Sequence, residues 1–469
     1  MARRPGRPGV DGAVLSATDP TGTEPLTTAD GHLLLELLAL PTAGPLEGGT
    51  PRLWEAQRVY AAAAAPLGFT VARHAAPDRA WAELPDVPLP VRGAAADPGF
   101  LTEQPSLLLR LGRPGTPRER TVMFNVHLDT VAGLEPVRHD PATGTFHGRG
   151  AVDAKGPAVA LLAGIRAALA ERPGLADRLA VLVQAVAGEE GGALGTIGTR
   201  PLVAAGHYGR LNVFCEPTGN LALTHCTAAM TARITTDGQD AVDDQPAAGH
   251  NATVLLGFLA QHLAGAITPG DGRLCIAGLH TGHLHNRVYG RGELLLNLAY
   301  PDRATAARLE HAVTEALADG LRAFADRFAA NPLLARTAVD AARITRLDWL
   351  KRGLPALERP TGERWLPALL ARAGIAEWPA GEPGFTCDAI WLAGHPGTGT
   401  VVLGPGTLAG NHAHAEGEFV RTTELAGFAR SVRDLLAAFD AGPHTGPPTD
   451  RPTAVPHPQS AQEARAACR

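Results

Sequence analysis

Apolar residues in the first half of the chain fall into short uninterrupted runs separated by longer segments. Three runs, at residues 121–126, 179–186 and 211–215, are rich in Val, Leu and Phe. Such runs are typical of strands that are buried on both faces of a parallel sheet. Residues 157–170, between the first two runs, form an apolar stretch of helical length. The order strand, helix, strand predicts an α/β fold with a mixed, largely parallel sheet.

Two helices and one strand are expected before this region. Residues 28–40 and 53–67 are rich in Leu or Ala, and the second segment stops at Gly68, a residue type that often follows a helix. Residues 69–73 have the composition of a strand. These elements extend the first predicted domain toward the N-terminus.

The pattern changes after Pro217. Strand-like segments are expected around residues 229–235 and 293–299, and helical patterns cover 252–263 and 304–328. Two strands and two long helices predict a small α+β unit that is inserted into the first domain.

Segments of the first domain return near the end of the chain, as a helix at residues 365–373 and a strand at 400–403. Both ends of the chain lack apolar periodicity, and we expect disordered tails there. The expected organisation, in chain order, is a tail (1–25), the first domain (26–225), the inserted unit (226–340), the first domain again (341–440) and a tail (441–469).

The composition describes a globular protein without a strong electrostatic field. The 469 residues are 45% hydrophobic and 19% charged, with a formal net charge of -5. Nucleic acid is not an expected partner, because phosphate binding needs a basic face. No apolar run has the length of a membrane span, and the N-terminus lacks the apolar stretch of a signal peptide. We therefore expect a cytoplasmic protein.

Side chains that bind metals or transfer protons follow the predicted strands. His127, the pair Glu189 and Glu190, and Glu216 stand just beyond strand ends, where open α/β sheets place their ligands. Asp153 lies in a glycine-rich segment. Each feature alone is commonly a polar turn, a helix start or a strand terminus. Their convergence on one side of a sheet predicts a metal site, and oxygen and imidazole ligands suit Zn²⁺, Mn²⁺ or Co²⁺.

Several blocks of sequence, in order along the chain, resemble the zinc peptidase family that contains acetylornithine deacetylase, succinyl-diaminopimelate desuccinylase, carboxypeptidase G and aminoacylase. The blocks are NVHLDTV (125–131), GRGAVDAKGP (148–157), AGEEGG (187–192), CEPT (215–218), CDA (387–389), LGPG (403–406) and HAHAEGEF (412–419). The resemblance is strongest to acetylornithine deacetylase. It implies a catalytic domain that is interrupted by a lid domain, which in this family often forms a homodimer.

The resemblance also implies two divalent metal ions, which we expect to be Zn²⁺, with Co²⁺ or Mn²⁺ as alternatives. One ion would be held by His127 and Glu216 and the other by Glu190 and His414, with Asp153 as the bridge.

Three further positions complete the implied site. Asp129 would orient a histidine ligand, and Glu189 would be the general base. The terminal histidine has two candidates, because His412 and His414 alternate. We favour His414, which stands at the family's distance from the segment Glu418-Phe419.

The lid departs from the family pattern at two positions. Val242 aligns with the histidine that polarises the scissile carbonyl, and Ala299 aligns with the arginine that binds a substrate carboxylate, whereas Asn286 matches the lid asparagine. Loss of one oxyanion donor typically costs about 10²–10³ in rate. The nearby His250, or one of the histidines within residues 280–285, is a candidate replacement.

Three functions are compatible with these residues. The first is metal-dependent hydrolysis of an amide bond in a small molecule, either an N-acyl amino acid or a small peptide-like substrate. The second is a metal-retaining binding protein without hydrolytic activity. The third is an altered amide-processing or amide-forming step in specialised metabolism. Retention of Glu189 favours catalysis, because a purely structural site needs no general base.

Overall fold

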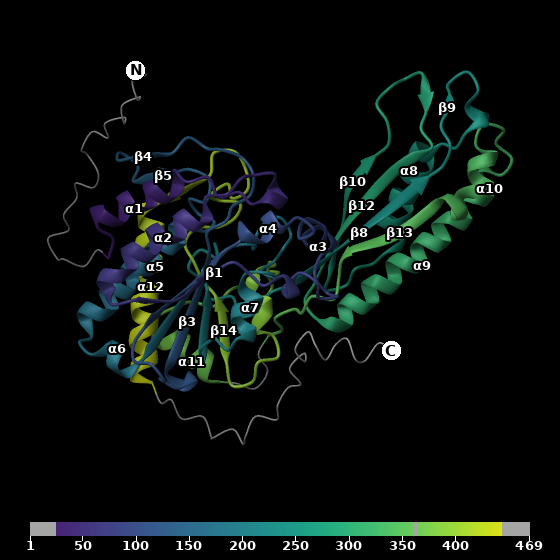
Figure 1. Cartoon of the computed structure of the whole chain (residues 1–469). Helices are drawn as coiled ribbons and strands as arrows, with labels where there is room; N and C mark the ends of the chain where they lie inside the picture. The colour runs from purple at the N-terminus through teal and green to yellow at the C-terminus, as the bar shows by residue number, and fades with distance from the viewer. Residues whose placement is uncertain (1–24, 360–363, 443–469) are drawn as a thin grey trace, which may run out of the picture.

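The chain has a larger α/β part and a smaller elongated part that projects from it (Figure 1). The computed structural model describes residues 25–359 and 364–442. The predicted tails lie almost entirely outside the described residues. The elongated part is formed by residues from the middle of the chain, so the larger part is assembled from segments on both sides of it.

A six-stranded mixed sheet forms the centre of the larger part. In spatial order its strands are β1 (Thr70–Ala75), β2 (Ser106–Leu111), β6 (Ala180–Val186), β3 (Thr121–His127), β7 (Leu211–Phe214) and β14 (Gly399–Val402). The last four strands are parallel, whereas β1 and β2 add an antiparallel edge. Every residue of β3 and β6 is buried. This burial on both faces explains the uninterrupted apolar runs and confirms the predicted fold class.

Helices cover this sheet, and two of them pack very closely. The longer helices are α1 (Thr28–Leu38), α2 (Leu53–Ala64), α5 (Lys155–Glu171), α11 (Trp365–Arg372) and α12 (Thr422–Ala441). The short helices are α3 (Leu89–Ala94), α4 (Pro98–Thr102), α6 (Leu175–Arg178) and α7 (Thr199–Ala204). Helix α5 lies between α12 and α1. Among the described residues, no helix combines the length and the apolar character that crossing a bilayer requires.

A small three-stranded sheet lies beside this core. It consists of β15 (Phe419–Arg421), β5 (Thr145–His147) and β4 (Arg138–Asp140). Strand β15 pairs with β5 in antiparallel register. This pairing brings the C-terminal segment against the glycine-rich segment that follows β5, although the two are far apart in sequence.

The elongated part, which we call the lid, is an antiparallel sheet with helices. Its strands, in spatial order, are β10 (Arg273–His280), β12 (Arg291–Tyr300), β8 (Ala228–Asp237) and β13 (Thr345–Lys351). Its helices are α8 (Ala252–Ala266), α9 (Arg303–Phe328) and α10 (Ala335–Ile344). A two-stranded ribbon of β9 (Ala241–Val242) and β11 (Arg287–Val288) stands at its far end (Figure 1).

The lid is larger than the sequence pattern predicts. We expected two strands and a boundary at residue 340, but β10 and β13 are also strands of this sheet, and β13 pairs with β8. The boundary therefore lies after residue 351. Both missed strands are edge strands, and β13 is mostly half-buried and mixes charged with apolar residues, so it lacks the apolar run of a central strand.

The close packing of α5 on α12 gives a test of the core. A Cβ atom added to Gly164 of α5 would stand 2.5 Å from the carbonyl oxygen of Ala429 and 2.7 Å from Cβ of Val432. Gly164→Ala should therefore lower the free energy of unfolding by about 1–3 kcal/mol, as overpacking does. Gly257→Ala is the matched control, because Gly257 of α8 has open space around it. The control should be neutral or stabilising by up to about 1 kcal/mol. Urea unfolding followed by tryptophan fluorescence measures both, and equal effects would contradict this account.

Candidate metal centre

Four of the predicted site residues stand at one edge of the central sheet. His127 is the last residue of β3, Glu189 and Glu190 follow β6, and Glu216 follows β7. These three strands are parallel neighbours, so their carboxyl ends meet at the same edge. His127, Glu190 and Glu216 are buried, and Glu189 is half-buried.

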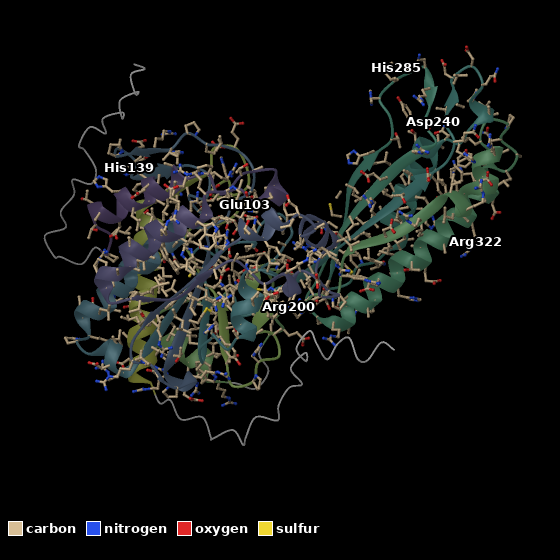
Figure 2. All side chains as sticks on the ribbon, viewed as in Figure 1. Glu103, His139, Arg200, Asp240, His285 and Arg322 are labelled. Atoms are coloured by element: carbon tan, nitrogen blue, oxygen red, sulfur yellow. The ribbon has the colours of Figure 1, made fainter. Side chains whose placement is uncertain are left out.

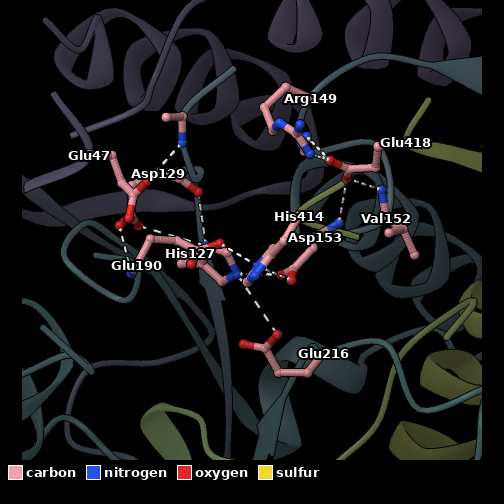
Figure 3. A network of polar contacts seen from close by, with 12 residues as sticks. Glu47, His127, Asp129, Arg149, Val152, Asp153, Glu190, Glu216, His414 and Glu418 are labelled. Carbon is pink, nitrogen blue, oxygen red and sulfur yellow. Dashed lines mark hydrogen bonds and ion pairs between the residues drawn. The ribbon is translucent and has the colours of Figure 1, made fainter. Parts of the chain in front are cut away.

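Asp153 is shared by two groups of side chains (Figure 3). Its Oδ1 atom is 2.8 Å from Nε2 of His127, which is also 3.8 Å from Oε2 of Glu216. Its Oδ2 atom is 3.1 Å from Nε2 of His414, which is also 3.0 Å from Oε1 of Glu190. One carboxylate therefore faces two histidines through two different oxygen atoms.

The cluster strongly favours positive charge. Burial, together with repulsion from Asp153, raises the pKa of Glu190 to about 7, and burial also raises the pKa of Glu216. Hydrogen bonds from the two histidines hold the pKa of Asp153 below its usual range, although burial opposes this. Contacts with Asp153 and Glu190 raise the pKa of His414 to about 10. A set of buried acids and a buried imidazole, completed by the exposed His414, suits divalent metal ions, which replace protons on such ligands.

Asp129 contacts the cluster in two ways. Its backbone oxygen is 2.9 Å from Nδ1 of His127, whereas its carboxylate Oδ1 is 3.7 Å from that nitrogen. The other carboxylate oxygen accepts hydrogen bonds of 3.0 Å from the backbone N–H groups of Gly188 and Glu190. Asp129 thus positions the histidine mainly through its backbone, and its side chain holds the turn that carries the two glutamates.

Glu189 stands beside this cluster. Oxygen and nitrogen atoms of His127, Glu189 and Glu190 come within 4.8 Å of one another. Burial, and then repulsion from Glu190, raises the pKa of Glu189 well above its usual value. Glu189 is thus a carboxylate with a raised proton affinity beside a group of residues that could hold a metal ion.

Glu418 fixes the segment that carries Asp153, a role that the sequence pattern does not reveal. Its carboxylate accepts hydrogen bonds from the backbone N–H groups of Gly150, Val152 and Asp153, at 3.0, 3.0 and 3.3 Å. It also pairs with Arg149 at 2.8 Å (Figure 3). Glu418 is 1% exposed. Its only sequence signal is its distance of four residues from His414.

The structure brings His414, and not His412, to the cluster. The ring of His412 instead stands edge-on to Phe419, with the ring centroids 5.8 Å apart. Both histidines have positive φ angles, of 56° and 61°, in the loop after β14. The ring of His414 therefore lies in the cluster, and the ring of His412, two residues earlier, lies outside it.

The lid residues singled out from the sequence do not join the cluster. Val242 and Asn286 are exposed in the β9–β11 region, where Val242 lies opposite Arg287. Figure 2 shows His285 and Asp240 at this same far end of the lid. His250 is buried, and its ring is occupied by the backbone N–H of Gln239 and by the carboxylate of Asp340, at 2.8 and 2.9 Å. His250 is therefore committed to holding the lid tip.

The fold is an α/β architecture with residues at one sheet edge that could hold metal ions. The model of peptidase family M20/M25/M40 matches residues 123–438, which is more than half of the chain. The chain belongs to this family, and it is an enzyme of the hydrolase class. Family membership implies divalent metal ions.

Two curated relatives are similar in sequence. A succinyl-diaminopimelate desuccinylase of a Methylobacterium species is 27% identical over 461 residues, which cover 92% of this chain and 100% of that protein. A putative LysW-lysine/LysW-ornithine hydrolase of Aeropyrum pernix is 33% identical over 176 residues. That second match covers 37% of this chain and 46% of the relative, so it spans about half of the relative's length.

Solved structures share the fold. A tripeptidase of Staphylococcus aureus has a TM-score of 0.63 at 16% identity, with 88% of this chain and 98% of that chain covered. An M20 family metallo-carboxypeptidase of Sulfolobus solfataricus has a TM-score of 0.62 at 11% identity, with 88% and 99% covered.

The role of Glu418 can be tested by metal binding. Glu418→Gln removes the charge that holds three backbone N–H groups beside Asp153, so metal affinity should fall about 10- to 100-fold, as it does when outer-shell partners are lost. Glu416→Gln is the control, because Glu416 is exposed two residues away. Calorimetric titration of metal-free protein with Zn²⁺ measures both. Unchanged affinity in Glu418→Gln would show that the segment holds its shape without this carboxylate.

Proposed function

We propose that the chain hydrolyses the amide bond of an N-acyl amino acid or a small peptide-like substrate. The observation that carries this proposal is the carboxylate of Asp153, which faces His127 through one oxygen and His414 through the other, with Glu189 beside the cluster. Relatives named as a succinyl-diaminopimelate desuccinylase and as a putative LysW-lysine/LysW-ornithine hydrolase support this substrate class.

The proposed ligands fall into two sets that share Asp153. His127 and Glu216 form one set, and Glu190 and His414 form the other. We propose Zn²⁺ as the metal, with Co²⁺ or Mn²⁺ as alternatives, and elemental analysis of purified protein would identify it. When bound, such ions act as Lewis acids toward an amide carbonyl and lower the pKa of water.

The chain's own residues then handle orientation and protons. Glu189 accepts a proton from the attacking water and later delivers it to the leaving nitrogen, the usual exchange for a general base of this kind. The backbone oxygen of Asp129, 2.9 Å from Nδ1, fixes the ring of His127 so that Nε2 faces the other ligands. His127, Asp153, Glu190 and Glu216 are buried, which limits competing water on that side of the cluster, whereas His414 is exposed.

The lid supports a second candidate within the same chemistry, which is an altered amide-processing or amide-forming step. Val242 is exposed and apolar, and Ala299 has no polar side chain, so neither supplies the contact that the resemblance implies.

We also propose a homodimer through the lid. Within the part of the chain that the structure describes, strand β10 pairs only with β12 and leaves one edge free. Sedimentation velocity would measure the association.

Substitution of Glu189 and Asp153 separates proton transfer from metal binding. Glu189→Gln should keep its metal and lose about 10²–10⁴ in turnover, the contribution of a general acid/base. Asp153→Ala should lose metal, because one bridge serves both sets of ligands. Turnover of a substrate hydrolysed by the wild-type protein and metal content by elemental analysis are the two measurements. Equal turnover of Glu189→Gln and wild type would reject the assigned base.

The altered lid predicts poor activity on N-acetylornithine. Since Val242 cannot donate a hydrogen bond to an oxyanion, and loss of one donor costs about 10²–10³ in rate, the metal-loaded protein should turn this compound over slowly or undetectably. Steady-state kinetics on N-acyl amino acids and dipeptides measures the preference. A kcat of about 10 s⁻¹ or more on N-acetylornithine, a rate ordinary for enzymes, would contradict this reading of the lid.

A further inference from the structure

Lysine is almost absent from this chain. Of 42 basic residues only two are lysine, Lys155 and Lys351, and the other 40 are arginine. Both lysines nevertheless lie close to the metal centre. Lysine differs from arginine in carrying a compact point charge on a flexible stem, so the two positions call for a physical explanation.

Lys155 is explained by the fold. It is the first residue of α5, it is 2% exposed, and its ammonium donates a hydrogen bond of 2.9 Å to the carbonyl oxygen of Leu40. It thereby ties the start of α5, two residues after Asp153, to the segment that follows α1.

Lys351 has no such partner. Within residues 25–359 and 364–442, its ammonium makes no hydrogen bond or ion pair. The neighbouring Arg352, by contrast, is exposed and pairs with Glu310 at 3.6 Å. The side chain of Lys351 is half-buried, so its charge is partly withdrawn from water without receiving a compensating contact.

The position of Lys351 connects the lid to the catalytic part. It is the last residue of β13, where a bulge follows Trp349, and it lies opposite Thr231 of β8. Helix α3 of the catalytic part lies against β13. The lid strand thus delivers this side chain to the junction between the two parts.

The ammonium of Lys351 reaches the turn that carries the proposed general base. A Cβ atom added to Gly192 would stand 3.9 Å from Nζ of Lys351, and nothing else outside the adjoining residues lies within 4 Å of that point. Gly192 has a φ of +75°, which suits glycine. Burial lowers the pKa of Lys351, and attraction to Glu189 partly offsets this effect. The cation therefore lies within electrostatic reach of the site, next to open space.

We propose that Lys351 binds the carboxylate of the substrate, a proposal that rests on the hydrolase function above. In an N-acyl amino acid, the carboxylate is only a few bonds from the scissile amide, so a cation that recognises it must stand close to the general base. Lys351 meets this requirement from the lid side, and a carboxylate there would give its ammonium the partner that it lacks. Binding of this group would also link substrate to both parts of the molecule.

The experiment compares acids with their amides. The probes are N-acetyl-leucine, N-succinyl-leucine and glycyl-leucine, each as the free carboxylate and as the C-terminal carboxamide. Lys351→Met removes the charge at nearly constant length, and Lys351→Arg keeps the charge. Arg352→Met is the matched control, because it removes a charge from the adjacent exposed position. Calorimetric binding to metal-loaded protein and steady-state kinetics are the two readouts.

Lys351→Met should weaken binding of the carboxylates about 10- to 100-fold, the worth of a hydrogen bond to a charged group, with a matching rise in KM and little change in kcat. The carboxamides should bind Lys351→Met and wild type alike. Lys351→Arg should retain most of the preference for the carboxylates, and Arg352→Met should behave as wild type.

Three outcomes would overturn the proposal. They are equal binding of acids and amides by the wild-type protein, equal loss of both in Lys351→Met, and a loss confined to kcat, which would mean that Lys351 acts on Glu189 instead. If the wild-type protein binds the carboxylates but hydrolyses none of them, the hydrolase proposal fails while calorimetry still decides the role of Lys351.

Discussion

The buried carboxylates are the constraint on which the rest of this structure depends. Asp153, Glu190 and Glu216 are withdrawn from water at one sheet edge, where each raises the cost of ionising the others. Positive charge must therefore accompany them, and the ring nitrogens of His127 and His414 lie 2.8–3.1 Å from Asp153 and Glu190. A site of this kind cannot be loosely held, because any displaced carboxylate would be buried without a partner.

Long-range contacts hold the site together. Three side chains of the cluster follow the ends of parallel strands, whereas Asp153 lies on a loop whose backbone N–H groups donate hydrogen bonds to Glu418. Pairing of β15 with β5 brings that glutamate into place. Helix α12, which follows β15, packs closely on α5, the helix that follows Asp153, at Gly164. The C-terminal quarter of the chain is thus required to complete a site that the first half begins.

The lid separates the recognition of substrate from the metal chemistry. Its far end carries the exposed Val242, and its buried His250 is used for structure. Its near end is where β13 leads back to the catalytic part. There the side chain of Lys351 lies beside the turn that follows β6. A lid that contacts the site through a different residue is a physical route to a changed substrate without a changed metal centre.

The sequence by itself determined the elements that local pattern controls. Strands buried on both faces appear as apolar runs, so β3, β6 and β7 and the polar side chains that follow them were predictable, as were the family and the fold class. Edge strands β10 and β13 escaped prediction because they are only partly buried and mix polar with apolar residues.

Only the tertiary structure decided which residues meet across long stretches of chain. The choice between His412 and His414, the use of the backbone oxygen of Asp129 and the anchoring role of Glu418 all depend on how separate loops fold against one another. The approach of Lys351 to Gly192 likewise joins two parts of the molecule that are 159 positions apart, 351 minus 192. Periodicity reports the environment of each segment, but such contacts are set by strand pairing and packing between segments, which no local pattern encodes.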